Sequence, residues 1–303
     1  MTFRVLTWNL WHGLNPYQRL LMRPMESPIA RRRRRRRQIE VLSGWKQSPQ
    51  DIICLQEVNP FSRQIKKISN GLALHGDGCI VNAGVKIARF GLPPFLEEGL
   101  ATFAGEGFSP RQWAETTLSG SAREYPGLLG ISLTVQLAER RKALLFEAQC
   151  GTKRIAVVNL HLHHGPDTVR QNLARKAAEL LKLKQWLEPR AKDWDFLAVC
   201  GDFNCDPQSS CLEPLESLGL KDTSQIARAE PFLTWNPQKN PLAGMSPELA
   251  GSEEVRAWDA GAHSFDRIYI RSVTPVEKVA LSMICEPELS DHFGLAAEIS
   301  FGS

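Results

Sequence analysis

Several features that define whole classes of protein are missing from this sequence of 303 residues. No run approaches the roughly 18 apolar residues that a membrane-spanning helix needs. The seven cysteines are an odd number and include no Cys-x-x-Cys pair. They therefore predict neither a zinc site built from thiolates nor a disulfide framework. The sequence predicts no transmembrane segment and no fold that depends on paired cysteines.

The sequence also lacks the patterns of covalent hydrolases and phosphate-binding loops. It contains no Gly-x-Ser-x-Gly block, no phosphatase-type cysteine loop and no Walker A sequence. Trp8, Asn9 and His12 stand where a signal peptide would carry its apolar core, and no small-residue cleavage site follows them. We therefore expect a cytoplasmic protein without a serine or cysteine nucleophile.

Positive charge is concentrated in one segment. The sequence has 37 basic and 33 acidic residues, but seven arginines are consecutive, from Arg31 to Arg37. Without those seven, the 37 basic residues become 30, against 33 acidic ones. At about 100° per residue, seven helical positions face every side of the helix. Two interpretations stay open: a solvated helix start, or a contact for a polyanion such as nucleic acid or an acidic lipid surface.

Continuous apolar runs alternate with helical patterns along the chain, and no shift in composition divides it. Such runs are typical of strands that are covered on both faces. The alternation predicts a single α/β domain over 1–303 with layered mixed sheets. The predicted strands are 3–9, 51–57, 154–162, 195–204, 265–270 and 293–301, with a weaker hairpin at 128–137 and 142–150; the predicted helices are 29–46, 60–74, 167–187 and 209–218.

Most predicted strands end in, or follow, a residue that can bind a metal ion or a phosphate. One Asn or Asp at a strand end usually forms a turn, but here six strands share the feature. Carboxylates suit Mg²⁺, which binds through one or two carboxylates plus substrate phosphate. Residues i and i+2 of a strand share a face, which pairs some of these side chains. The residues concerned are Asn9, Glu57, Asn159, His161, Asp202, Asn204, Asp266, Asp291 and His292.

Six short blocks carry these residues: TWNLWHG, DIICLQEV, VVNLHL, CGDFN, SFDRIYI and LSDHFGL. In this order, over positions 7 to 295, they resemble the signature blocks of the endonuclease/exonuclease/phosphatase superfamily, which has the deoxyribonuclease-I-like fold. The resemblance implies an α/β fold, a four-layer αββα sandwich of two mixed β-sheets flanked by helices. It also implies phosphoester hydrolysis by metal-activated water, with Mg²⁺ or Mn²⁺ as cofactor and no covalent intermediate.

The resemblance further implies a role for each matching residue on the metal side of the site. Glu57 matches the principal metal ligand, and Asp291 matches the second metal-side carboxylate. Asn9 matches the residue that supports metal and phosphate. Asp202 and Asn204 match the pair that positions the nucleophilic water and the scissile phosphate.

Four more residues match the phosphate side of the family's site. His292 matches the phosphate-binding histidine, and Asp266 matches the carboxylate that hydrogen-bonds it. Asn159 and His161 match a pair that faces the phosphate. A bond from Asp266 would hold the orientation of the His292 ring and favour the imidazolium.

The resemblance leaves the substrate class open among nucleic acid, a phospholipid head group and a small phosphoester. We expect a phosphodiesterase or nuclease-like hydrolase first. The block around His161 resembles the sphingomyelinase, deoxyribonuclease-I and phosphoinositide branches of the family. A sphingomyelinase-like or phosphoinositide phosphoesterase is therefore the alternative. A catalytically silent binding module of the same fold is a third hypothesis. The presence of all nine matching residues argues against that hypothesis.

Overall fold

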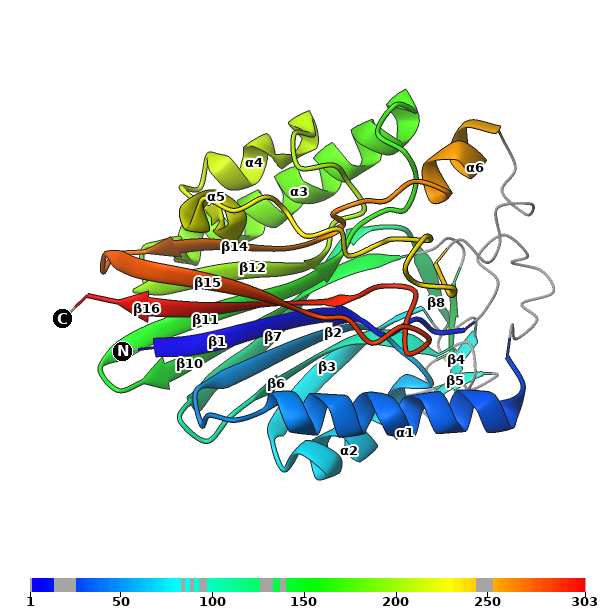
Figure 1. The fold of residues 1–303 in the computed structure, drawn as a ribbon, viewed down its shortest axis with the longest axis horizontal. Coiled ribbons are helices and arrows are strands. Elements are labelled where there is room, and N and C mark those ends of the chain that lie inside the picture. The colour runs from blue at the N-terminus through cyan, green and yellow to red at the C-terminus, as the bar shows by residue number, and fades with distance from the viewer. Residues whose placement is uncertain are drawn as a thin grey trace.

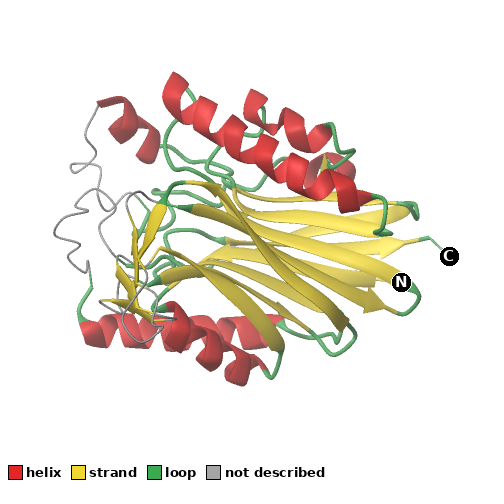
Figure 2. Cartoon of the chain, turned by 180° about the vertical axis from the view of Figure 1, so that it is seen from behind, coloured by secondary structure: helices red, strands yellow, loops and turns green. Residues whose placement is uncertain are grey.

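The fold is known from a computed structural model that describes residues 2–13, 26–82, 85–87, 90–92, 97–125, 133–136, 140–243 and 253–302. Two six-stranded mixed sheets pack face to face, and helices cover both outer faces (Figure 1). Figure 2 shows the same four layers from behind. The predicted αββα sandwich is therefore confirmed. No helix in the described ranges is long and apolar enough to cross a membrane.

The first sheet has the strand order β15-β16-β1-β2-β6-β3, and two helices cover its outer face. Its strands are β1 (Thr2–Asn9), β2 (Asp51–Val58), β3 (His75–Asn82), β6 (Glu98–Ala104), β15 (Val276–Ile284) and β16 (Gly294–Phe301). The covering helices are α1 (Pro28–Trp45) and α2 (Phe61–Leu72).

The second sheet has the order β13-β14-β12-β11-β10-β7. Its strands are β7 (Ser109–Ser119), β10 (Arg141–Cys150), β11 (Lys153–His161), β12 (Phe196–Asp202), β13 (Lys221–Asp222) and β14 (Asp266–Ser272). The helices on its side are α3 (Arg170–Ala191), a 3₁₀ turn (Ser210–Leu212), α4 (Glu213–Glu216) and α5 (Thr223–Ala227). The remaining elements are α6 (Glu253–Asp259) and a small sheet of β4 (Val85–Ile87), β5 (Phe90–Leu92), β8 (Ala122–Tyr125) and β9 (Leu133–Gln136).

An apolar core fills the space between the two large sheets. Phe3 of β1 lies edge-on to Phe196 of β12, with ring centroids 4.6 Å apart, and stacks on Phe301 of β16. Each sheet also buries its outer face under helices, and this explains why the strands are apolar on both faces. This packing holds the ends of strands from both sheets at fixed positions.

Two local predictions are wrong. The helix predicted over 167–187 does not end at Leu187, because α3 continues through Pro189 to Ala191. Pro189 lies in the last turn, where it removes a single backbone bond, and Ala191 is still buried in the core. The predicted hairpin of 128–137 with 142–150 does not form between the described residues, because β10 pairs with β7 and β11. Residues 128–132 and 137 of that prediction lie outside the described ranges.

Candidate active site

The strand pairings bring the polar strand ends together. β1 runs parallel to β2, and β11 runs parallel to β12, so their carboxyl ends lie at the same end of the sandwich. The register places His161 and Asp266 opposite Asp202, one on each side of β12. Gly201 allows this close pairing, because a Cβ there would lie 2.0 Å from the carbonyl oxygen of Leu160.

Asn9 connects the two sheets. Its Nδ2 donates to Glu57 Oε1 at 3.2 Å and to Asp202 Oδ2 at 3.0 Å. Its Oδ1 accepts the backbone N–H of Trp11 at 3.0 Å, and this bond sets the orientation of the amide. The side chain therefore orients Glu57 and Asp202. The predicted place of Asn9 on the metal side of the site stays a prediction.

Glu57 sits at an irregularity of β2, where the register to β6 shifts between Leu55 and Val58. Its φ of 53° is unusual for a residue with a side chain and is typical of functional sites. Its Oε2 accepts the backbone N–H of His12 at 2.8 Å and lies 3.1 Å from the Nδ1 of the same residue. Burial works to raise the pKa of Glu57, but the charge of His12, together with the hydrogen bonds from the His12 backbone N–H and from Asn9, lowers it overall. The carboxylate is therefore held in its ionised form.

Asp291 is the second carboxylate of the predicted metal pair. Burial raises its pKa to about 7, and the charge of Glu57 acts in the same direction. Among the described residues, no group of three or more His, Cys, Asp or Glu side chains forms a closed metal cage. Two carboxylates that disfavour each other's charge nevertheless fit Mg²⁺, which needs one or two carboxylates and takes its other ligands from water and phosphate.

Asp202 lies at the centre of the polar group and is almost fully buried. Its Oδ1 accepts the backbone N–H of Asn204 at 3.0 Å. Its Oδ2 lies 3.5 Å from His161 Nε2 and 3.7 Å from His292 Nε2. Burial raises the pKa of Asp202, and the His292 charge opposes this effect. A carboxylate with a raised pKa between two imidazoles is suited to accept a proton.

The hydrogen bond predicted between Asp266 and His292 is present. Asp266 Oδ2 lies 2.7 Å from His292 Nδ1, and both residues are buried. Burial alone would lower the pKa of His292, but Asp266 and Asp202 raise it well above its usual value. The Trp235 ring packs edge-on against His292 at 5.2 Å between centroids. The ring is thus held as an imidazolium with Nε2 directed toward Asp202.

His161 has a different electrostatic setting from His292. Burial lowers its pKa well below the usual value, and the charge of Arg141 at the start of β10 adds to this effect. Arg141 is itself buried, with 3% of its surface exposed. The two histidines beside Asp202 are therefore a neutral ring and a charged ring. Arg141 was not assigned to the site from sequence, because the Arg-Lys-Ala block that contains it matches no family pattern in full.

Asn159 was predicted to face the phosphate, and the structure requires a correction. Its side chain is fully buried between the sheets. Its Nδ2 donates to the carbonyl oxygens of Leu55 and Ala101 at 3.1 and 3.0 Å, and its Oδ1 accepts from Gln56 Nε2 at 2.7 Å. Because both atoms already have partners inside the sandwich, Asn159 joins the two sheets beneath the site and does not contact substrate.

Asn204 has a left-handed backbone, with φ of 50°, and depends on several neighbours. Its Nδ2 donates to Leu162 O at 3.2 Å, and its Oδ1 lies 3.1 Å from His164 Nδ1. Its carbonyl oxygen accepts a hydrogen bond from Lys176 Nζ. Lys176 is fully buried and also binds Asp167 Oδ1 at 2.7 Å. Lys176 therefore fixes the turn that presents Asn204.

Sequence reasoning did not identify Lys176, although one signal was available. Lys176 lies on α3 four, seven and eleven residues before Leu180, Leu183 and Leu187, all fully buried. A lysine at such a position is in the apolar stripe of the helix. Because a buried lysine requires partners, its position could have pointed to a structural ion pair.

We expect Lys176→Met to lower kcat about 10²-fold while KM for a small diester changes little. A small misplacement of a reacting group costs about this much, and the variant removes the bond that fixes Asn204. The unpaired Asp167 should also lower the melting temperature. Steady-state kinetics with circular dichroism would measure both effects. Lys182→Met, which changes an exposed lysine of the same helix, is the control. An unchanged kcat in folded Lys176→Met would contradict this role.

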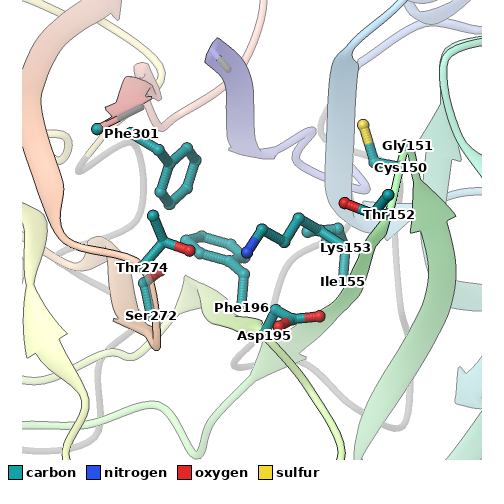
Figure 3. Close-up of a pocket in the computed structure, with 11 residues that line it drawn as sticks. Cys150, Gly151, Thr152, Lys153, Ile155, Asp195, Phe196, Ser272, Thr274 and Phe301 are labelled. Atoms are coloured by element: carbon teal, nitrogen blue, oxygen red, sulfur yellow. The ribbon is translucent and has the colours of Figure 1, made fainter.

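A separate cavity of about 240 Å³ lies at the opposite end of the sandwich. Its lining includes Cys150, Lys153, Asp195, Phe196 and Phe301. Figure 3 shows the Lys153 side chain extending across it toward Phe196 and Thr274. These residues lie at the far ends of β10, β11, β12 and β16 from the polar site. We therefore place the chemistry at the polar strand ends and not in this cavity.

Comparison with protein-family models shows the family to which the chain belongs. The model of the endonuclease/exonuclease/phosphatase family matches residues 6–292. The chain belongs to the endonuclease/exonuclease/phosphatase family. Membership in the endonuclease/exonuclease/phosphatase family implies phosphoester hydrolysis, and the family consists mostly of metal-dependent phosphoesterases. No curated protein sequence matches the chain.

Solved structures share the fold of this family member at low sequence identity. The endonuclease/exonuclease/phosphatase from Bacteroides vulgatus is 17% identical, with 100% of each chain covered and a TM-score of 0.64. TDP2 from D. rerio, complexed with a single-strand DNA product, is 15% identical, with 99% of each chain covered and a TM-score of 0.63. The human Nocturnin catalytic domain with bound sulfate is 18% identical, covers 99% of this chain and 95% of its own, and has a TM-score of 0.61.

Proposed function

We propose that this chain is a Mg²⁺-dependent phosphodiesterase that hydrolyses nucleic acid by direct attack of water. The observation that carries the proposal is the setting of Asp202. Its carboxylate lies between a neutral His161 and a charged His292 and is connected to Glu57 through Asn9. A base, an imidazolium and a metal carboxylate thus meet within one buried polar network.

Glu57 and Asp291 are the residues that would hold the ion. When bound, Mg²⁺ supplies positive charge that polarises the phosphoester and neutralises the charge that develops in the transition state. The protein keeps Glu57 ionised through the backbone N–H of His12 and the charges around it. Ser290 Oγ donates to the carbonyl oxygen of Asn9 at 2.5 Å, which ties the Asp291 loop to the end of β1.

Asp202 and Asn204 would position and deprotonate the attacking water. Asp202 Oδ2 is the proton acceptor, and the backbone N–H of Asn204 and the amide of Asn9 fix its carboxylate. The Asn204 amide has one N–H bound to Leu162 O, so its second N–H is available to a water or a phosphoryl oxygen. The deprotonated water would attack phosphorus directly, the bond from phosphorus to the leaving oxygen would break, and the departing alkoxide would take a proton from solvent, with no covalent intermediate.

His292 and His161 would act on the phosphate itself. The imidazolium of His292 can donate its Nε2–H to a phosphoryl oxygen as negative charge develops. Asp266 holds that ring in place and maintains its charge through Nδ1. His161, kept neutral by burial and by Arg141, provides a second nitrogen beside Asp202.

Two observations favour nucleic acid as the substrate class. The chain shares its fold with TDP2 from D. rerio, which was solved with a single-strand DNA product. Arg34 donates to the carbonyl oxygens of Leu10 and Trp11, and Arg31 lies near Gly13, so both arginines lie behind the loop that carries His12. Arginine is the residue that recognises backbone phosphates most effectively.

A substrate panel with Mg²⁺ tests the proposal. It contains single-stranded DNA, RNA, sphingomyelin, a phosphoinositide and bis-p-nitrophenyl phosphate. We expect hydrolysis of the small diester and of a nucleic acid, with release of product blocked by a chelator. Preferential hydrolysis of sphingomyelin or the phosphoinositide would contradict the nucleic-acid assignment. No hydrolysis of any substrate, with Mg²⁺ or Mn²⁺ present, would support a catalytically silent member of the family.

A further inference from the structure

The arginine run of α1 has two different faces. Arg32, Arg33, Arg36 and Arg37 are exposed, and the last two pair with Glu40 on the helix surface. Arg31 and Arg34 are buried, together with Gln38 and Leu42, at helical spacing. The run is therefore neither wholly a solvated helix start nor a uniform basic surface. Its buried face points at the first sheet, next to the loop that follows β1.

Arg34 can be buried because all three of its guanidinium nitrogens have hydrogen-bond partners. Its Nη1 donates to the carbonyl oxygens of Leu10 and Trp11 at 2.9 and 3.0 Å. Its Nε and Nη2 bind both carboxylate oxygens of Glu26, and its guanidinium lies over the Trp11 ring at 4.6 Å. Arg34 thus holds the end of β1 and uses the Glu26 carboxylate fully.

Arg31 has no equivalent pairing. Only 8% of its surface is exposed, yet its Nε and Nη2 have no hydrogen-bond partner in the described ranges. Burial lowers its pKa, the Glu26 carboxylate only partly opposes this effect, and the charge of Arg34 adds to the lowering. A buried guanidinium that lacks partners is costly, so native proteins rarely retain one without a ligand or counterion.

Arg35 increases the local excess of positive charge. Its Nη2 donates to the neutral amide oxygen of Asn59 at 2.8 Å. Burial, followed by the charges of Arg31 and Arg34, lowers its pKa to about 9. Among the residues that the structure describes, these three guanidiniums therefore share one carboxylate, that of Glu26. This imbalance is what an anion would correct.

Gly13 lies against this group of side chains. It has φ of 73°, and a Cβ on it would lie 3.0 Å from both Arg34 Nη2 and Glu26 Oε2 and 3.8 Å from Arg31 Nε. Its lack of a side chain lets the backbone approach the Arg34–Glu26 pair closely and adds no side chain beside Arg31 Nε. Gly13 directly follows His12, whose backbone N–H binds Glu57. In Figure 1 α1 begins at the end of the sandwich where β1 ends, so the arginines lie on the active-site side.

We propose that Arg31, beside Gly13 and the Arg34–Glu26 pair, forms a second phosphate subsite, which takes a phosphate next to the scissile one in a nucleic-acid strand. The inference rests on the proposed function, because it extends the same substrate beyond Glu57. Nε and Nη2 of Arg31 form one edge of the guanidinium, and that edge can bind two oxygens of one phosphate in parallel. A flat lipid surface would instead meet the exposed arginines on the other face of α1.

The first test measures binding without catalysis. Melting temperature is recorded for the metal-free full chain against rising inorganic phosphate and, separately, a short thymidine oligonucleotide. Arg31→Met is compared with the matched control Arg32→Met. We expect both ligands to stabilise the wild type and Arg32→Met, and Arg31→Met to need about tenfold more of either one. An equal response of all three proteins, or an equal loss in both variants, would overturn the subsite.

A second test separates this inference from the proposed function. We expect Arg31→Met to raise KM for the oligonucleotide about tenfold and to leave hydrolysis of bis-p-nitrophenyl phosphate unchanged. If no protein hydrolyses the small diester, the proposed function fails, while the binding result still decides on the subsite. Binding to phosphatidylserine vesicles that depends on Arg31, without oligonucleotide binding, would overturn the nucleic-acid assignment. Should Arg31→Met not fold, Arg31→Lys keeps the charge but loses the two-nitrogen edge, and the same loss of phosphate response is expected.

Discussion

Replacing Asp202 with asparagine is expected to lower kcat for a phosphodiester by about 10³-fold, within the range that loss of a positioned acid or base usually costs. Asparagine has almost the same shape and can keep a bond to the backbone N–H of Asn204, but it cannot accept a proton from water. The loss should appear in kcat, measured with bis-p-nitrophenyl phosphate at saturating Mg²⁺. Metal affinity, measured by calorimetry, should change much less.

The control for this prediction is Asp195→Asn. Asp195 immediately precedes the other end of β12 and accepts the backbone N–H of Arg154 at 2.8 Å. Asp195→Asn makes the same chemical change next to the opposite end of β12, away from the polar site. Both variants should show wild-type circular dichroism. If folded Asp202→Asn kept more than a tenth of the wild-type kcat, Asp202 would not be the base.

Glu57→Gln is expected to abolish tight Mg²⁺ binding and to lower activity by about 10²-fold or more, as loss of one group that stabilises transition-state charge does. The substitution keeps the size of the side chain but removes the negative charge of the carboxylate. In the wild type, hydrogen bonds from Asn9 and from the His12 backbone N–H stabilise that charge. Calorimetric titration with Mg²⁺ and hydrolysis at increasing Mg²⁺ concentrations would measure the two effects separately.

Glu40→Gln provides the matched control, because Glu40 is an exposed carboxylate that pairs only with surface arginines of α1 in the described structure. That variant should bind Mg²⁺ and turn over like the wild type. Wild-type Mg²⁺ affinity in Glu57→Gln would show that Glu57 is not a metal ligand. Lost Mg²⁺ affinity with full activity would instead show that the reaction does not need the metal ion.

The layered fold and the gathering of strand ends could be predicted from the sequence because both follow from local patterns. Continuous apolar runs indicated strands covered on both faces, and the polar residues at their ends indicated where the site lies. The bond between Asp266 and His292 was implied by the resemblance of two sequence blocks to the family, and it is present. The strands and the site's place needed only residue types within short segments, whereas this bond needed the family resemblance as well.

Contacts between distant segments could not be predicted in the same way. Asn159 shares a strand face with His161, but Gln56 and the carbonyl oxygens of Leu55 and Ala101 take up its amide. Its role therefore depends on how the two sheets stack. The division of the arginine run likewise depends on where Leu10 and Trp11 meet α1. Residue type alone cannot distinguish Arg31, which lacks a partner, from Arg34, which has several.

The most direct measurement of the central claim is the rate of bis-p-nitrophenyl phosphate hydrolysis by the wild type, Glu57→Gln and Asp202→Asn, each with Mg²⁺ and with excess chelator. The account predicts turnover only by the wild type with Mg²⁺, restored after chelation when Mg²⁺ is returned. Turnover by the wild type in chelator, or by both variants at the wild-type rate, would contradict a metal-dependent phosphodiesterase built on these strand ends.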